Sequence, residues 1–173
     1  MSTTTNLLLL LLVLTSSIQY SSADAHFIAT TCNQTPHPAI CKSLLESEQQ
    51  SFTAVNARAF AWIAYHITAT HASGTLAVLN KLLVFHDGEP IAAPMEVCAH
   101  LYGRAVEDLT VAGQSMTVEA YVEAAKRVDN ARGAAGLCEK AFGMEFPSPV
   151  TAENRVLADD CSVTFDLLRM LSG

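Results

Sequence analysis

Five cysteines carry the chemistry that is most constrained by spacing in this chain. All five follow an apolar N-terminal block, and they are Cys32, Cys41, Cys98, Cys138 and Cys161. In a chain that enters the secretory pathway, cysteines in this number form disulfides. The odd count therefore predicts two bridges and one thiol left over.

The other reactive side chains do not form the arrangements that catalysis or metal binding needs. His66 and His71 are five residues apart, so they do not share a helix face as an i, i+4 metal pair does. The adjacent acidic pairs 107–108 and 159–160 would point to different sides of a helix, which disfavours a glycosidase acid/base pair. No Gly-x-Ser-x-Gly elbow frames a serine nucleophile. The sequence predicts neither an enzyme nor a metal or cofactor site.

The N-terminal block is typical of a removable secretory signal. Residues 6–14 are an Asn followed only by Leu and Val, and Ala23-Asp24-Ala25 has the small-x-small form that signal peptidase cuts. A membrane span needs about 20 apolar residues, more than this block supplies. We therefore expect a signal peptide over residues 1–25, a secreted domain over 26–173 and no membrane attachment after cleavage.

Charge narrows the class of partner. The chain has 17 acidic and 10 basic residues and a net charge of −7, which becomes −6 when Asp24 leaves with the leader. Without a basic run, such a chain is a poor binder of nucleic acid or of anionic membranes, and it suits a basic partner. A mature chain of this length is one domain with a single core.

Apolar residues in the mature chain recur with helical rather than alternating periodicity. Amphipathic helices joined by short loops fold most simply as an up-down-up-down bundle, so we expect an all-α four-helix bundle. The expected helices cover residues 51–85, 94–112, 117–142 and 151–171.

Glycines, prolines and capping residues set the expected ends of these helices. The joint at 112–114 ends the second helix because it contains a glycine, and Thr117 begins the third with Glu119 in its first turn. Thr151 begins the fourth. The expected buried stripe of the first helix is Phe52, Val55, Ala59, Ile63, Ile67, Val78, Leu82 and Phe85.

These helices select one disulfide pairing. Cys32 and Cys41 flank a segment with two prolines that favours a turn, so a local bridge forms easily. Cys98 lies near the start of the second helix and Cys138 near the end of the third, and those ends are adjacent in antiparallel neighbours. The longer loop contributes about 3–4 kcal/mol in the chain-entropy account. Cys161 lies on an apolar stripe, where a buried free thiol acts as a small hydrophobe.

Four segments resemble the plant invertase and pectin methylesterase inhibitor family. Residues 32–44, CNQTPHPAICKSL, are similar to its opening Cys-x-x-Thr…Pro…Cys hairpin. Residues 98–109, in which Cys is followed by Tyr, Ala and Leu, resemble its second-helix motif. Residues 138–142 resemble the end of its third helix, and residues 148–154 resemble the entry to its fourth.

The resemblance implies a fold and a function. The fold is a disulfide-closed helical hairpin over residues 26–50, followed by a four-helix bundle over 51–173. The function is non-catalytic inhibition of a cell-wall or vacuolar carbohydrate enzyme, either pectin methylesterase or acid invertase, by docking over its active-site cleft. The protein would then act in the apoplast or the vacuole.

Sequence features point to both target enzymes. Residues 115–121 lack the Pro-Lys-Phe tripeptide of some invertase inhibitors. The cysteine in the fourth helix resembles several pectin methylesterase inhibitors, whereas the Ser-Pro-Val-Thr entry at 148–151 is similar to invertase inhibitors. The choice of target stays open at this point.

The helices that the family presents to its target suggest where a partner would bind. We expect the partner to bind a polar face on the second and third helices, although any single residue of that face is more simply explained as ordinary solvent-exposed surface.

Asn33-Gln34-Thr35 is an N-glycosylation sequon. The rival functions are a secreted carrier of an apolar ligand and an allergen-like bundle without inhibitory activity. The expected partner-binding residues are His100, Arg104, Glu107, Glu119, Glu123 and Lys126.

Overall fold

The computed structural model describes residues 22–173, and over that range the protein is entirely helical. Residues 1–21 of the expected signal peptide lie outside the described residues. The expected cleavage point at Ala25 falls in the first turn of the first described helix, α2 (Ser22–Cys32). None of the helices within this range is long and apolar enough to cross a membrane.

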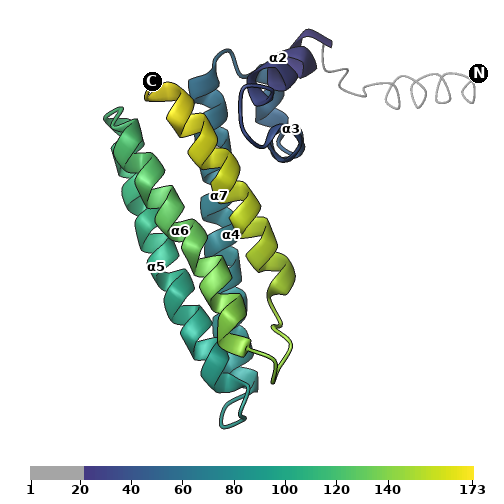
Figure 1. Cartoon of the computed structure of the whole chain (residues 1–173), viewed down its shortest axis with the longest axis vertical. Helices are drawn as coiled ribbons and strands as arrows, with labels where there is room; N and C mark the ends of the chain where they lie inside the picture. The colour runs from purple at the N-terminus through teal and green to yellow at the C-terminus, as the bar shows by residue number, and fades with distance from the viewer. Residues whose placement is uncertain (1–21) are drawn as a thin grey trace, which may run out of the picture.

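Four long helices form the body of the molecule and run alternately up and down (Figure 1). They are α4 (Ala57–Phe85), α5 (Ala92–Thr117), α6 (Tyr121–Phe142) and α7 (Thr151–Leu171). Each packs against the next along the chain, and α7 closes the ring against α4. The expected all-α, up-down-up-down bundle is confirmed.

A small helical hairpin precedes the bundle and lies against α7 and α4 (Figure 1). It consists of α2 and α3 (Pro38–Glu46), and a 3₁₀ helix, η1 (Gln49–Thr53), leads on to α4. Proline begins α3 because its missing N–H has no helical partner at that position. Buried Ile28 and Leu45, together with a Phe27–Phe60 ring contact at 5.0 Å, join the hairpin to the bundle core.

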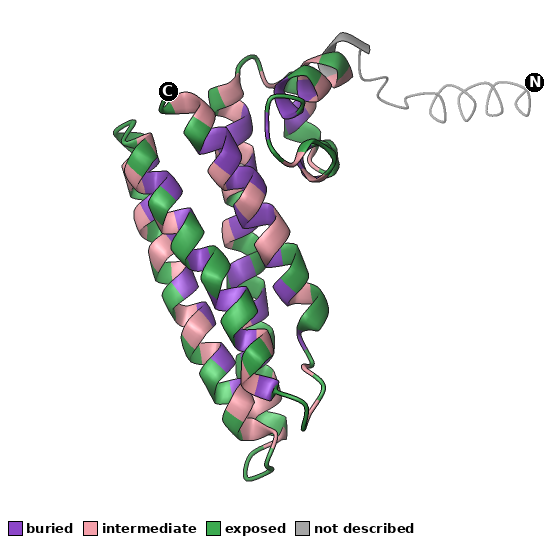
Figure 2. Ribbon diagram, in the orientation of Figure 1, coloured by how far each residue is buried: buried purple, intermediate pink, exposed green. Residues whose placement is uncertain are grey.

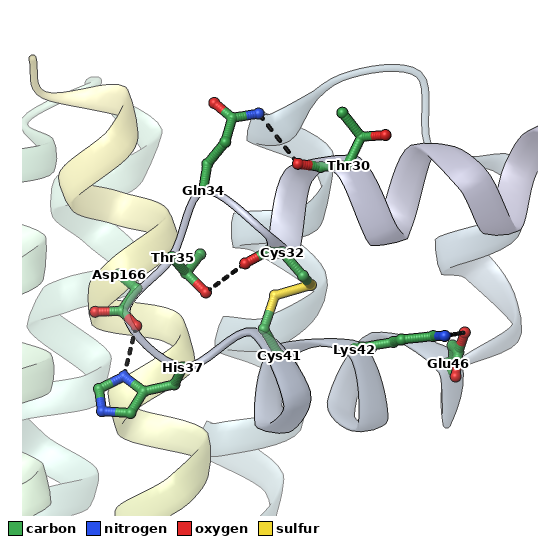
Figure 3. Close-up of a disulfide and its surroundings, with 9 residues drawn as sticks. All are labelled: Thr30, Cys32, Gln34, Thr35, His37, Cys41, Lys42, Glu46 and Asp166. Carbon is green, nitrogen blue, oxygen red and sulfur yellow. Dashed lines mark hydrogen bonds and ion pairs between the residues drawn. A yellow bond between two sulfur atoms is a disulfide. The ribbon is translucent and has the colours of Figure 1, made fainter.

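The structure pairs the cysteines as the sequence analysis expects. Cys32 and Cys41 close the α2–α3 hairpin with their Cα atoms 5.5 Å apart (Figure 3). Cys98 and Cys138 join α5 to α6 with Cα atoms 4.6 Å apart. Cys161 is a free, buried thiol, and burial raises its pKa, which keeps it in the unreactive protonated form.

The first bundle helix buries a different stripe from the expected one. Val55, Val78 and Phe85 are 84%, 43% and 69% exposed, so these predictions are wrong, and Ile63 and Ile67 are only half-buried. Figure 2 shows buried and exposed stretches alternating along each bundle helix. In α4 the buried stripe lies one position further along than expected and consists mostly of small side chains, which let neighbouring helices approach closely. The expected stripe had instead been assigned to the larger apolar residues of this helix. The buried positions are Phe60, Ala61, Ala64, Thr68, Ala72, Thr75 and Leu79.

Four helix boundaries also differ from the prediction, and the smallest difference is the start of α5 at Ala92 instead of Pro94. The first bundle helix begins at Ala57 rather than Ser51, because the Asn56 side chain accepts a hydrogen bond from the Ala59 N–H at 2.9 Å and caps the helix there. The second continues through the expected joint at 112–114 to Thr117. Thr117 therefore ends α5 instead of starting the next helix, and its hydroxyl donates to the Gln114 carbonyl.

Position 113 lies inside α5, and it requires a glycine because another helix approaches it closely, not because the chain turns there. The glycine is buried, and a Cβ placed on it would lie 2.2 Å from the Tyr65 hydroxyl oxygen and 2.7 Å from Cζ of the same ring. Tyr65 on α4 thus occupies the space that any side chain at position 113 would need. A glycine here signals helix–helix contact, which is why the sequence pattern was misleading.

This contact predicts the effect of adding one methyl group. We expect Gly113→Ala to lower the free energy of unfolding by about 1 kcal/mol, because overpacking outweighs the helical preference for Ala. Gly136→Ala is the matched control, since Gly136 is also helical but has open space around its Cα, and we expect it to stabilise slightly. Urea denaturation of both variants checks this, and equal effects at the two positions would contradict the proposed contact.

Candidate functional site

The α5–α6 polar face consists of His100, Arg104 and Glu107 on α5 with Glu123 and Lys126 on α6. The three α5 residues are exposed and line one shallow surface depression together with Ala99 and Gly103. They follow one another at helical spacing, so α5 presents an imidazole, a guanidinium and a carboxylate along one side. Such a row can form hydrogen bonds and ion pairs with a protein surface.

Arg104 also reaches the groove between α5 and α6. That groove is lined by apolar and small residues as well as by Asp108 and Asn130. Asp108, in this lining, pairs with Arg127 of α6 at 3.2 Å across the helix pair, and Arg127 also bonds Glu123 of its own helix at 2.7 Å. The groove therefore combines a paired charge network with the side chain of Arg104.

Glu119 does not lie where the sequence analysis placed it. The third bundle helix begins at Tyr121, so Glu119 lies in the α5–α6 turn, where it adopts a left-handed φ of 58°. Its carboxylate pairs with Arg58 of α4 at 2.6 Å. The part of α5 from residue 101 to its end at Thr117 separates it from His100, and the expected six-residue set is not one compact patch.

The Cys98–Cys138 bridge anchors the end of the polar face that carries His100. Both sulfurs are buried, and they link the start of α5 to the end of α6. His100 follows the bridge by two residues on α5, so its backbone is anchored close to a covalent link. A face that is ordered before binding loses less entropy on association.

A polar network that the sequence analysis missed supports the same end of the bundle. The buried Tyr102 hydroxyl donates to the Asn154 side-chain oxygen at 2.8 Å, and the Asn154 amide donates to Glu139 at 2.6 Å. The Thr151 hydroxyl donates to the other Glu139 oxygen at 2.7 Å. Asn154 on the apolar stripe of α7, one turn before Leu157, is the sequence signal that could have revealed this network.

The network changes the acidity of its members. Hydrogen bonds from Thr151 and then Asn154 hold the pKa of Glu139 below its usual value, although burial opposes this. Burial raises the pKa of Tyr102, so its hydroxyl stays protonated and available as a donor. The Glu139 carboxylate therefore joins α6 to α7, and the hydrogen bond from Tyr102 to Asn154 adds α5 to the network.

Within residues 22–173, no group of three or more His, Cys, Asp or Glu side chains is placed to hold a metal ion. One member of each adjacent acidic pair, 107–108 and 159–160, is bonded to a basic side chain or a histidine of another helix. Asp108 bonds Arg127 on α6, whereas Asp160 bonds His71 on α4.

The sequence matches the family described as plant invertase/pectin methylesterase inhibitor over residues 26–167. The chain belongs to this family. A family member named pectinesterase inhibitor, from Actinidia deliciosa, is 24% identical over 153 residues, which cover 87% of this chain and 82% of the relative.

Two solved structures share the fold. A mutant form of a pectin methylesterase inhibitor from Arabidopsis matches with a TM-score of 0.72 and 19% identity, over 83% of this chain and 95% of that one. A pectin methylesterase inhibitor from Arabidopsis thaliana matches with a TM-score of 0.64 and 20% identity, over 86% and 97%. The chain therefore shares its overall fold with these two inhibitors.

The Glu139 network predicts an acid-dependent loss of stability. Because its pKa is depressed in the folded chain, its contribution is present above the ordinary Glu pKa and is lost as the pH falls through the folded value. We expect Thr151→Val to reduce stability at neutral pH and to match the wild type at strongly acidic pH. Urea denaturation at several pH values measures the difference.

Thr110→Val provides the control for this experiment. Thr110 is exposed on α5 and its hydroxyl donates only to the Val106 carbonyl of its own helix. Its substitution is expected to leave the pH dependence unchanged. A constant gap between Thr151→Val and the wild type at every pH would contradict the assignment of Glu139.

Proposed function

We propose that this protein is a secreted, non-catalytic inhibitor that docks over the active-site cleft of a carbohydrate enzyme of the plant cell wall or vacuole. Family membership over residues 26–167 is the observation that carries this proposal. The relatives described above are named inhibitors of pectin methylesterase, so we place that enzyme ahead of acid invertase as the target.

The α5–α6 polar face is our proposed contact surface. It is exposed except at Glu123, which is half-buried and paired with Arg127. It carries side chains of both charge signs and lies on two helices joined by a disulfide. Arg104 is its most promising anchor, because arginine is enriched at interface hot spots and here it borders both a depression and a groove. Glu119, which is engaged by Arg58 at the end of the bundle, lies at the margin of this surface.

A paired inhibition assay tests the proposal. The mature chain, residues 26–173, is titrated against pectin methylesterase and against acid invertase. We expect pectin methylesterase to lose activity, and we expect the chain without either enzyme to turn over no substrate. Inhibition of invertase alone would reverse the choice of target. If a folded, disulfide-intact chain inhibits neither enzyme, a bundle without inhibitory function is the better description.

Charge reversal at one position locates the surface. We expect Arg104→Glu to weaken inhibition by about tenfold or more, which corresponds to about 1.4 kcal/mol of binding free energy. Lys81→Glu makes the same charge change at an exposed position on α4 and is expected to leave inhibition within about twofold of the wild type. Equal losses for the two variants would place the contact elsewhere.

The secretory route also proposed here has a separate chemical test. Asn33 lies exposed in the turn after α2, where an attached glycan would meet solvent. Expression through a plant secretory pathway is expected to give a chain that begins at His26 and loses mass on treatment with a peptide N-glycosidase. Asn33→Gln should abolish that mass change, and an unprocessed N-terminus would contradict the signal peptide.

A further inference from the structure

Two buried carboxylates on α7 are each held by a histidine from another element. Asp166 is 6% exposed, and its Oδ2 lies 2.8 Å from Nδ1 of His37, in the segment between α2 and α3. Asp160 is 7% exposed, and its Oδ2 lies 2.5 Å from Nδ1 of His71 on α4. Each imidazole is more than 40% exposed, so solvent protons reach it while its carboxylate partner is sheltered.

The two contacts lie where separate parts of the molecule join α7. Figure 3 shows the His37 ring directed at Asp166 from the segment between Cys32 and Cys41, which their disulfide closes into a loop. The contact therefore attaches the hairpin to the bundle. The His71–Asp160 contact joins α4 to α7, next to the Thr68–Thr164 hydroxyl pair at 2.8 Å.

We propose that His37 and His71 are proton-dependent clasps, which hold the hairpin and α4 against α7 when the imidazoles carry charge and loosen when they lose it. The imidazole is the side chain whose charge changes between about pH 5 and 8. A hydrogen bond between two charged groups is roughly twice as strong as one between neutral groups. A buried carboxylate left with a neutral partner is only partly compensated.

Other charged and titratable groups surround the two histidine–aspartate contacts. Asp159 neighbours Asp160 along α7, and Arg132 and Asp129 of α6 act on the adjacent Cys161 thiol. Glu48 and His66 line a surface groove with His71 on one side, and Glu153 does so on the other. Beside His37, Lys42 and Glu46 pair with each other on α3 and point away from Asp166 in Figure 3.

The sign of the pH effect follows from the geometry. Each contact exists only in the folded chain and is stronger when the imidazole carries charge, so we expect stability to decrease as the pH rises above the range in which imidazoles are charged. Burial raises the pKa of Asp160, and His71 opposes that rise. Protonation of Asp160 would remove its charge, so the second clasp is also limited on the acid side.

Thermal unfolding of the disulfide-intact chain between pH 5.5 and 7.5 tests the clasps. We expect the wild-type Tm to fall by about 4–8 °C more over this range than that of the His37→Gln/His71→Gln double variant. His86→Gln is the matched control, since His86 also bonds a carboxylate at 2.8 Å, but that of exposed Glu89. It is expected to keep the wild-type slope.

Hydrogen exchange separates the two clasps. After correction for intrinsic rates, His37→Gln should lower protection of the α2–α3 hairpin about fivefold at pH 5.5 and leave the middle of α4 unchanged. His71→Gln should do the reverse. Asp166→Asn, which keeps the shape of the side chain, should reproduce the His37→Gln pattern. If the double variant and His86→Gln show the same pH slope as the wild type, the proposal is wrong.

Discussion

A helix that packs against other elements over much of its surface can carry polar side chains only if each of them finds a partner, and α7 depends on this constraint. Asn154 meets Tyr102 and Glu139, Thr164 meets Thr68, and the two buried aspartates meet histidines of α4 and the hairpin. Apolar contacts tolerate sliding, whereas these pairs are satisfied only at one helix register. They therefore fix how α4, α5, α6 and the hairpin lie around α7.

This constraint divides the molecule into two regions with different tasks. The α5–α6 pair is joined covalently and carries exposed charged residues on its outer side, while α7 supplies the internal polar contacts. A surface that acts by covering another protein needs a fixed shape more than it needs reactive groups. The same residues that order the interior thus support the outer face proposed to meet the enzyme.

Much of this fold is predictable from the sequence, because cysteine spacing and helical periodicity reflect strong local constraints. The bundle, the disulfide pairs and the buried Cys161 were all expected. Errors arose where helices approach closely: Gly113 was interpreted as a joint, and the α4 stripe was assigned to Ile63 and its neighbours instead of to Ala64 and Thr68. Small residues give a weak hydrophobic signal, although they are what close packing requires.

The candidate site was less predictable, because position along a helix does not specify which partner a side chain meets. Glu119 was expected in a helical first turn, yet its pairing with Arg58 joins segments far apart in the chain. The partners of Glu139, Asp160 and Asp166 are likewise set by tertiary packing. A polar residue on an apolar stripe, such as Asn154, indicates only that a partner must exist.

The buried thiol of Cys161 also affects the route by which the chain reaches its native state. In an unfolded chain, a free thiolate can attack either disulfide and shuffle the bonds. Docking of α7 buries the sulfur and keeps it protonated, so exchange stops once the bundle has formed. The native pairing is then protected kinetically, and heat that releases α7 would start scrambling and make inactivation irreversible.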